Sequence, residues 1–140
     1  MPLFMELKDT HRVTMTKSEL AHLERRQGQV AKAKLLYRAT LLEWQRLGHR
    51  AAIAHELECM AMIAEAQQED QRAAKLFGAA EILRETIRIP MTPFERAEYD
   101  PEIKSLRANM DETDFVQAWA EGRMLSMEQA ITLALEDGDS

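Results

Sequence analysis

The chain has 140 residues, of which 46% are hydrophobic, 30% are charged and one is cysteine; this indicates a soluble globular domain and excludes a disordered chain or a disulfide framework. No apolar run approaches the roughly 20 residues of a bilayer-spanning helix, and the N-terminus lacks the basic start and apolar core of a secretory signal. We therefore expect a cytoplasmic protein that does not enter a membrane.

The net charge of −6 is unevenly distributed along the chain. Residues 1–93 carry 14 Lys and Arg against 12 Asp and Glu, whereas residues 94–140 carry 4 against 12. Binding to nucleic-acid phosphates needs clustered cations, so the C-terminal part is not expected to bind DNA.

Strong helix formers dominate the composition, and Val, Ile and Thr are sparse, which predicts an all-α fold. The chain also repeats at an offset of 40 residues: "LERRQGQVAKAKLLYRATLL" aligns with "IAEAQQEDQRAAKLFGAAEI". The matches recur at spacings of 3 and 4, the helical period, and conserve side-chain size as well as polarity. They include Ala33 with Ala73 and Tyr37 with Phe77.

Each repeat is expected to be a helix pair, and a glycine or proline follows three of the four predicted helices. Gly28 and Gly48 suit a left-handed helix end, and Pro90 stops the last helix. We expect an N-terminal extension at 1–15 and two helix hairpins within 16–90, with helices at about 16–27, 30–47, 50–67 and 69–87.

Residues 91–140 are expected to form a C-terminal cap of three shorter helices. The first begins at a capping box of Thr92 and Glu95, and Pro101 is expected to kink or restart it. The second begins near Asp111 and stops at Gly122. A second capping box, Ser126 with Gln129, begins a helix that runs to about Glu136.

A small residue followed four positions later by an aromatic one, on the second helix of each pair, resembles the tetratricopeptide pattern in a long, degenerate form. The segments "AAKLFGAAEILRE", "PFERAEY" and "AWAEGRMLSMEQAI" resemble the C-terminal helical-repeat region of bacterial LuxR-type and large ATP-binding transcriptional regulators. The resemblance covers about residues 20–136 and departs from the family at Pro101. It implies a superhelical stack of helix hairpins, an α-solenoid, with a scaffolding role in regulation.

The stretch "DFVQAWAEGRMLSMEQAITLALE" invites comparison with a helix-turn-helix. Its second helix offers one base-reading side chain, Gln129, no Lys or Arg, and acids that repel phosphate. We therefore interpret it as the cap that closes the open end of a repeat stack.

The segment "HELEC" resembles part of a zinc-protease helix, but the second histidine is replaced by Cys59. A buried structural thiol is the favoured interpretation, so no catalytic, cofactor-binding or metal-binding residue is predicted. Two alternatives stay open: a metal-dependent enzyme that uses His55, with His22 as a further ligand, and a nucleic-acid-binding helical protein.

The first helices of tetratricopeptide-like pairs line the concave side, where a protein or peptide partner binds. We thus predict a non-catalytic interaction module, which also forms a homodimer if a second copy covers its open face. The residues predicted to line the groove are Met15, Ser18, His22, Arg25, His55, Glu58, Met62 and Glu65.

Overall fold

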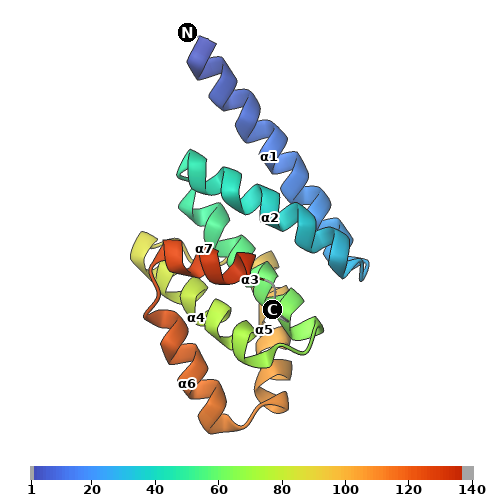
Figure 1. The fold of residues 1–140 in the computed structure, drawn as a ribbon, viewed down its shortest axis with the longest axis vertical. Helices are drawn as coiled ribbons and strands as arrows, with labels where there is room; N and C mark the ends of the chain where they lie inside the picture. Colours follow the sequence, from blue (N-terminus) through green and yellow to red (C-terminus); the bar gives the residue numbers. More distant parts are fainter. Residues whose placement is uncertain (1, 137–140) are drawn as a thin grey trace. The chain divides into compact units, whose positions relative to one another are not determined.

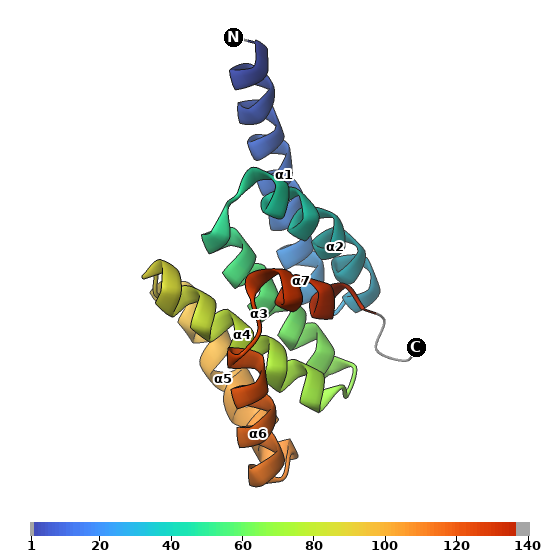
Figure 2. The ribbon, with the colours of Figure 1, turned by 60° about the vertical axis from the view of Figure 1, so that its left-hand side comes forward.

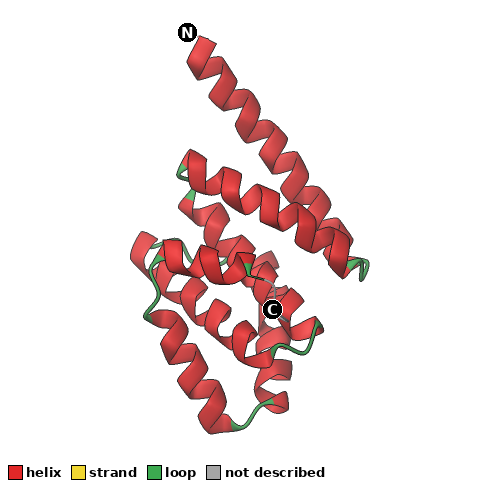
Figure 3. Cartoon of the chain, viewed as in Figure 1, coloured by secondary structure: helices red, strands yellow, loops and turns green. Residues whose placement is uncertain are grey.

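The computed structural model describes residues 2–136, and within them every regular element is a helix (Figure 3). The all-α prediction is therefore confirmed. The helices are α1 (Pro2–Arg26), α2 (Val30–Leu47), α3 (Arg50–Ala66), α4 (Asp70–Ile87), α5 (Pro93–Asn109), α6 (Glu112–Arg123) and α7 (Met127–Leu135).

The chain divides into two compact units, Met1–Ile53 and Ala54–Ser140, and the division falls within α3. We call them unit 1 and unit 2 and describe each by itself. The division differs from the sequence-based expectation, which placed a boundary between the second hairpin and the cap at residues 90 and 91.

Unit 1 is built on the hairpin of α1 and α2 (Figure 1). α1 begins at Pro2 and not near residue 16, so the expected N-terminal extension is part of this helix. Proline is tolerated in the first turn of a helix, where its missing N–H has no partner to lose. Packing extends beyond the predicted start of the helix, because the His11 ring contacts the buried Trp44 of α2 edge-on at 5.2 Å between centroids.

Unit 2 is organised around α4, against which α5, α6 and α7 pack (Figures 1 and 2). The closest approach is between α4 and α6 and depends on two buried glycines. A Cβ atom on Gly78 would lie 2.2 Å from the Trp119 carbonyl oxygen, and one on Gly122 would lie 2.0 Å from the Lys75 carbonyl oxygen. The prediction that Gly122 stops the helix was wrong: α6 runs to Arg123, and the glycine serves the crossing of the two helices.

Both predicted capping boxes are present, and they begin α5 and α7. α5 then continues through Pro101, so the expected restart at that residue does not occur. Asp111 precedes α6 as predicted, although its side chain makes no capping hydrogen bond. The capping residues are Thr92 with Glu95 and Ser126 with Gln129.

The backbone of the two expected repeats has the same conformation at positions 40 residues apart. α2 and α4 span 30–47 and 70–87, and the helices before them end at Arg26 and Ala66. In the turns after the first helices, Gly28 and Gln68 have φ of 79° and 64°. After the second helices, Gly48 and Arg88 have φ of 72° and 60°.

Replacing Gln68 with glycine is expected to stabilise the protein, because Gln68 adopts a left-handed conformation that glycine adopts without strain. The left-handed region costs a non-glycine residue about 1 kcal/mol, which sets the upper limit of the gain in unfolding free energy. Urea denaturation of Gln68→Gly and Gln67→Gly checks this. The second variant, one position earlier at a residue without positive φ, should lose stability; equal effects would contradict the strain argument.

Among the described residues, no helix combines the length and the apolar character needed to cross a membrane.

Candidate functional site

Three of the four predicted groove residues of unit 1 contact α2: Ser18, His22 and Arg25. Trp44 donates its indole N–H to Ser18 at 3.0 Å, and the Tyr37 hydroxyl lies 2.6 Å from His22 Nδ1. Arg25 donates to the same hydroxyl at 3.1 Å. Ser18 and His22 are each 7% exposed. Met15, at 47%, is the one exposed member of this group of four.

The four predicted groove residues of unit 2 are also mostly covered. Glu58 is 2% exposed and Met62 is 7% exposed, while His55 and Glu65 are half-buried. A buried side chain cannot contact a partner without rearrangement. The prediction that these eight residues line an open groove is therefore corrected, because most of them lie in packing contacts between helices. The physical reason is that polar residues of α1 and α3 have buried polar partners, and such residues look like surface residues in the sequence.

A buried ion network connects α3, α4 and α5. Arg84 donates two hydrogen bonds to Glu58, from Nε at 2.6 Å and from Nη2 at 3.0 Å, and it lies 3.4 Å from Glu95. Burial disfavours the charge on Arg84, but Glu58 and Glu95 outweigh it and raise the pKa of the guanidinium above its usual value. Glu95 also accepts the backbone N–H of Thr92 at 2.9 Å, so the network includes the start of α5.

His55 adjoins this network. Its Nδ1 lies 3.5 Å from Glu58 Oε1 and 3.4 Å from Glu95 Oε2, and its Nε2 lies 3.8 Å from Cys59 Sγ. Burial opposes a charge on the imidazole, but Cys59, Glu58 and Glu95 outweigh it and raise the pKa of His55 to about 11. Cys59 is fully buried, as the sequence predicted.

The contact between the carboxyl groups of Glu65 and Glu102 is expected to make the stability of unit 2 depend on pH. Burial raises the pKa of Glu65, and the neighbouring Glu102 carboxyl raises it further, to about 7, against a hydrogen bond from Ser105 that lowers it. A carboxyl whose pKa is raised by folding stabilises the native state at low pH and loses that contribution as pH rises through 7. We expect Glu65→Gln to raise the melting temperature at pH 8 and to have a smaller effect at pH 5.

Thermal unfolding at the two pH values tests this expectation, with the exposed Glu19→Gln as the matched control. A shift of equal size at both pH values in Glu65→Gln would contradict a pKa of about 7 for Glu65 in the folded protein.

Unit 2 contains an open groove between α5 and α6, to which α4 also contributes a lining residue, with a volume of about 770 Å³. Aromatic side chains form its floor. Phe115 and Trp119 of α6 have ring centroids 5.4 Å apart, and Trp119 stacks on the buried Phe77 of α4 at 6.1 Å. Phe77 also meets Tyr99 of α5 edge-on at 5.4 Å. Val116, which also lines the groove, is 53% exposed to solvent.

Cationic side chains surround this floor. The guanidinium of Arg96 lies 5.7 Å from the Tyr99 ring centre, and that of Arg107 lies 4.8 Å from the Phe115 ring centre, in cation–π contacts. Lys104 is exposed. Glu81 and Asp100 also line the groove, and the three arginines of the lining form ion pairs: Arg96 with Asp100, Arg107 with Glu112 and Arg123 with Glu81. The groove lining therefore combines aromatic area with a small excess of positive charge, in which the structure gives Lys104 no ion pair among the described residues.

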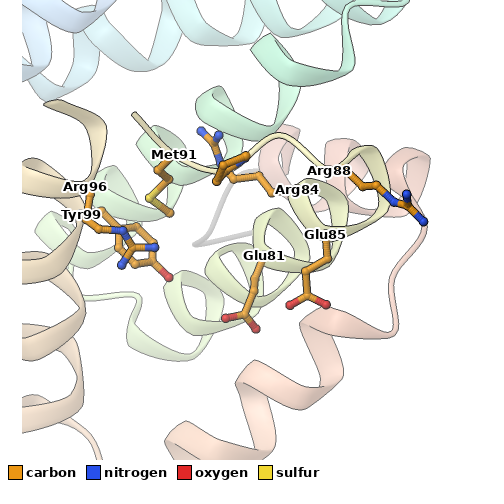
Figure 4. Close-up of a pocket in the computed structure, with 8 residues that line it drawn as sticks. Glu81, Arg84, Glu85, Arg88, Met91, Arg96 and Tyr99 are labelled. Atoms are coloured by element: carbon orange, nitrogen blue, oxygen red, sulfur yellow. The ribbon is translucent and has the colours of Figure 1, made fainter. Parts of the chain in front are cut away.

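An adjoining cavity of about 380 Å³ shares part of this lining (Figure 4). Tyr99 and Arg96 of α5 lie on one side of it, and Glu81 of α4 lies on the other (Figure 4). Glu81 accepts hydrogen bonds from Trp119 Nε1 at 2.9 Å and from Arg123 at 2.6 Å. These bonds fix the position of the Trp119 indole and thus the shape of the floor.

Sequence reasoning did not predict this groove. Phe115 and Trp119 were expected to close a repeat stack, whereas they form the floor of an open site. The signal that could have found it is the spacing of Arg96, Tyr99 and Arg107 along α5. These residues are three and then eight positions apart, intervals close to one and two helical turns, so arginines and an aromatic share one side of the helix.

Comparison of the chain with models of protein families, with curated proteins and with solved structures gave no match.

Proposed function

We propose that the chain is a non-catalytic, tetratricopeptide-like helical module that binds a protein partner, and that it acts in or beside a bacterial transcriptional regulator of the kind its sequence resembles. The groove of unit 2 is the observation that carries the proposal. Its lining joins Trp, Tyr and Phe rings with arginines, the residue types that dominate binding energy at protein interfaces.

The expected partner segment has an apolar side chain flanked by carboxylates. The apolar group would cover Val116 and the edge of Trp119, which the groove leaves partly open. The carboxylates would meet Lys104, for which the structure gives no ion-pair partner among the described residues. Such a segment fits the helix-in-groove or peptide-in-groove modes of recognition.

The recurrence of helix bounds and left-handed residues at an interval of 40 supports the tetratricopeptide-like part of the proposal. Two sequence segments that reach the same backbone conformation at matched positions behave as copies of one hairpin. We infer a repeat protein whose interaction surface lies on the helices that follow the second hairpin.

Affinity capture from the native cell extract tests the proposed function with three baits: the wild type, Val116→Glu and Leu35→Glu. Both substitutions place a carboxylate at an exposed position, 53% and 71% exposed, but Leu35 belongs to α2 of unit 1 and is not a residue of the groove lining. The wild type and Leu35→Glu should retain the same partner, and Val116→Glu should lose it at least tenfold. Retention by all three baits would contradict the assignment of the groove. Recovery of the chain itself as the groove-dependent species would identify a homodimer.

A further inference from the structure

His55 and Cys59 are four residues apart on α3, so their side chains lie on the same face, one turn apart. The Cys59 Sγ and His55 Nε2 atoms are 3.8 Å apart. A tetrahedral zinc ion, with bonds of about 2.3 Å to sulfur and about 2.0 Å to nitrogen, holds these two atoms about 3.5 Å apart. The two donors therefore already have nearly the separation that one ion requires.

The other side of the imidazole is arranged as in metal-ligating histidines. Glu58 and Glu95 place carboxylate oxygens 3.5 Å and 3.4 Å from Nδ1. Such carboxylates favour the proton on Nδ1, and a bound ion would displace the proton from Nε2, the nitrogen that faces the thiol. Because Glu58 is held by Arg84 and Glu95 by its capping box, both carboxylates are fixed in place.

The charge of the cluster also suits a divalent cation. Glu58 and Glu95 carry two negative charges, of which Arg84 compensates one. A Cys59 thiolate adds another, so the cluster has a net charge of −2 when His55 is neutral. Thiolate and imidazole donors together select zinc-class ions over magnesium or calcium, which prefer oxygen ligands.

We propose that Cys59 and His55 form a binding site for a zinc-class divalent ion, with Glu58 and Glu95 as positioning residues and water completing the coordination. The ion would link α3 to the start of α5 through His55 and Glu95. This inference is independent of the protein-binding function, because none of its residues lines the groove of unit 2.

Titration of the reduced, metal-free full chain with cobalt tests the site. Cys59 is the single cysteine of the chain, so a thiolate-to-cobalt charge-transfer band can arise only from this residue. The expected result is a band that saturates at one cobalt per chain and is bleached by zinc. Absence of the band, or saturation at one cobalt per two chains, would overturn the proposal.

Three variants distinguish a metal ligand from a positioning residue and from a histidine outside the proposed site. Cys59→Ser should abolish the band, and Glu95→Gln, which can still form the capping box, should weaken cobalt binding about tenfold or more. His49→Ala, at an exposed histidine of unit 1, should bind cobalt as the wild type does. Wild-type affinity in Glu95→Gln would refute the positioning role.

A measurement on the unmodified chain covers the case in which Cys59→Ser does not fold. Stoichiometric zinc should slow alkylation of Cys59 at least tenfold and raise the melting temperature, whereas magnesium should do neither. Unchanged alkylation with zinc would count against the site.

Discussion

Gly122→Ala is expected to separate α6 from α4 and to lower the free energy of unfolding by about 3 kcal/mol or more. The added Cβ would lie 2.0 Å from the Lys75 carbonyl oxygen and 2.8 Å from the Lys75 Cα, and backbone atoms cannot rotate away as a side chain can. Alanine improves the helix propensity of α6 by about 1 kcal/mol, which is too little to offset the clash. Urea denaturation followed by circular dichroism measures the loss.

Gly48→Ala is the matched control, since it makes the same chemical change where a Cβ would meet nothing within 4 Å. Its cost comes from a φ of 72°, at which alanine is strained by about 1 kcal/mol. If Gly122→Ala costs no more than Gly48→Ala, the close crossing of α4 and α6 is not what stabilises unit 2.

Arg84→Met is expected to lower the free energy of unfolding by about 3–5 kcal/mol, because it leaves the carboxylate of Glu58 buried without its bidentate partner. The side chains of Arg84 and Glu58 are only 8% and 2% exposed, so water cannot replace the lost hydrogen bonds. Denaturant unfolding of the full chain measures the change.

The double variant Glu58→Gln with Arg84→Met distinguishes a buried pair from two independent contributions. Removing both charges leaves no unpaired ion, so the double variant should be more stable than Arg84→Met alone. Additive losses would mean that the two residues act separately. The exposed pair of Arg107 and Glu112 provides a comparison, and its removal should cost much less than the removal of Arg84.

The regular elements could be predicted because local signals determine them. The two capping boxes, the left-handed glycines and the interval of 40 residues each act over a few neighbouring positions, and each reappears in the backbone. Gln68 shows the limit of this reasoning: its left-handed conformation follows from the repeat and not from its side chain.

The site could not be predicted because it depends on contacts between helices distant in the sequence. Gly122 illustrates the difficulty, since a glycine that ends a helix and a glycine that admits a neighbouring backbone are the same residue in the sequence. Glu58 illustrates it again: a glutamate on a helix face predicts exposure until its buried partner Arg84, 26 positions later, is known.

We propose that another protein binds in the groove between α5 and α6. A photo-crosslinking amino acid at Val116, introduced into the protein in its native cells, tests this binding, with the same amino acid at Leu35 as reference. We expect a discrete adduct of constant mass from position 116, which disappears when Ile103 of the groove lining is also changed to Glu. Adducts from position 116 that match those from position 35 in mass and amount would contradict it.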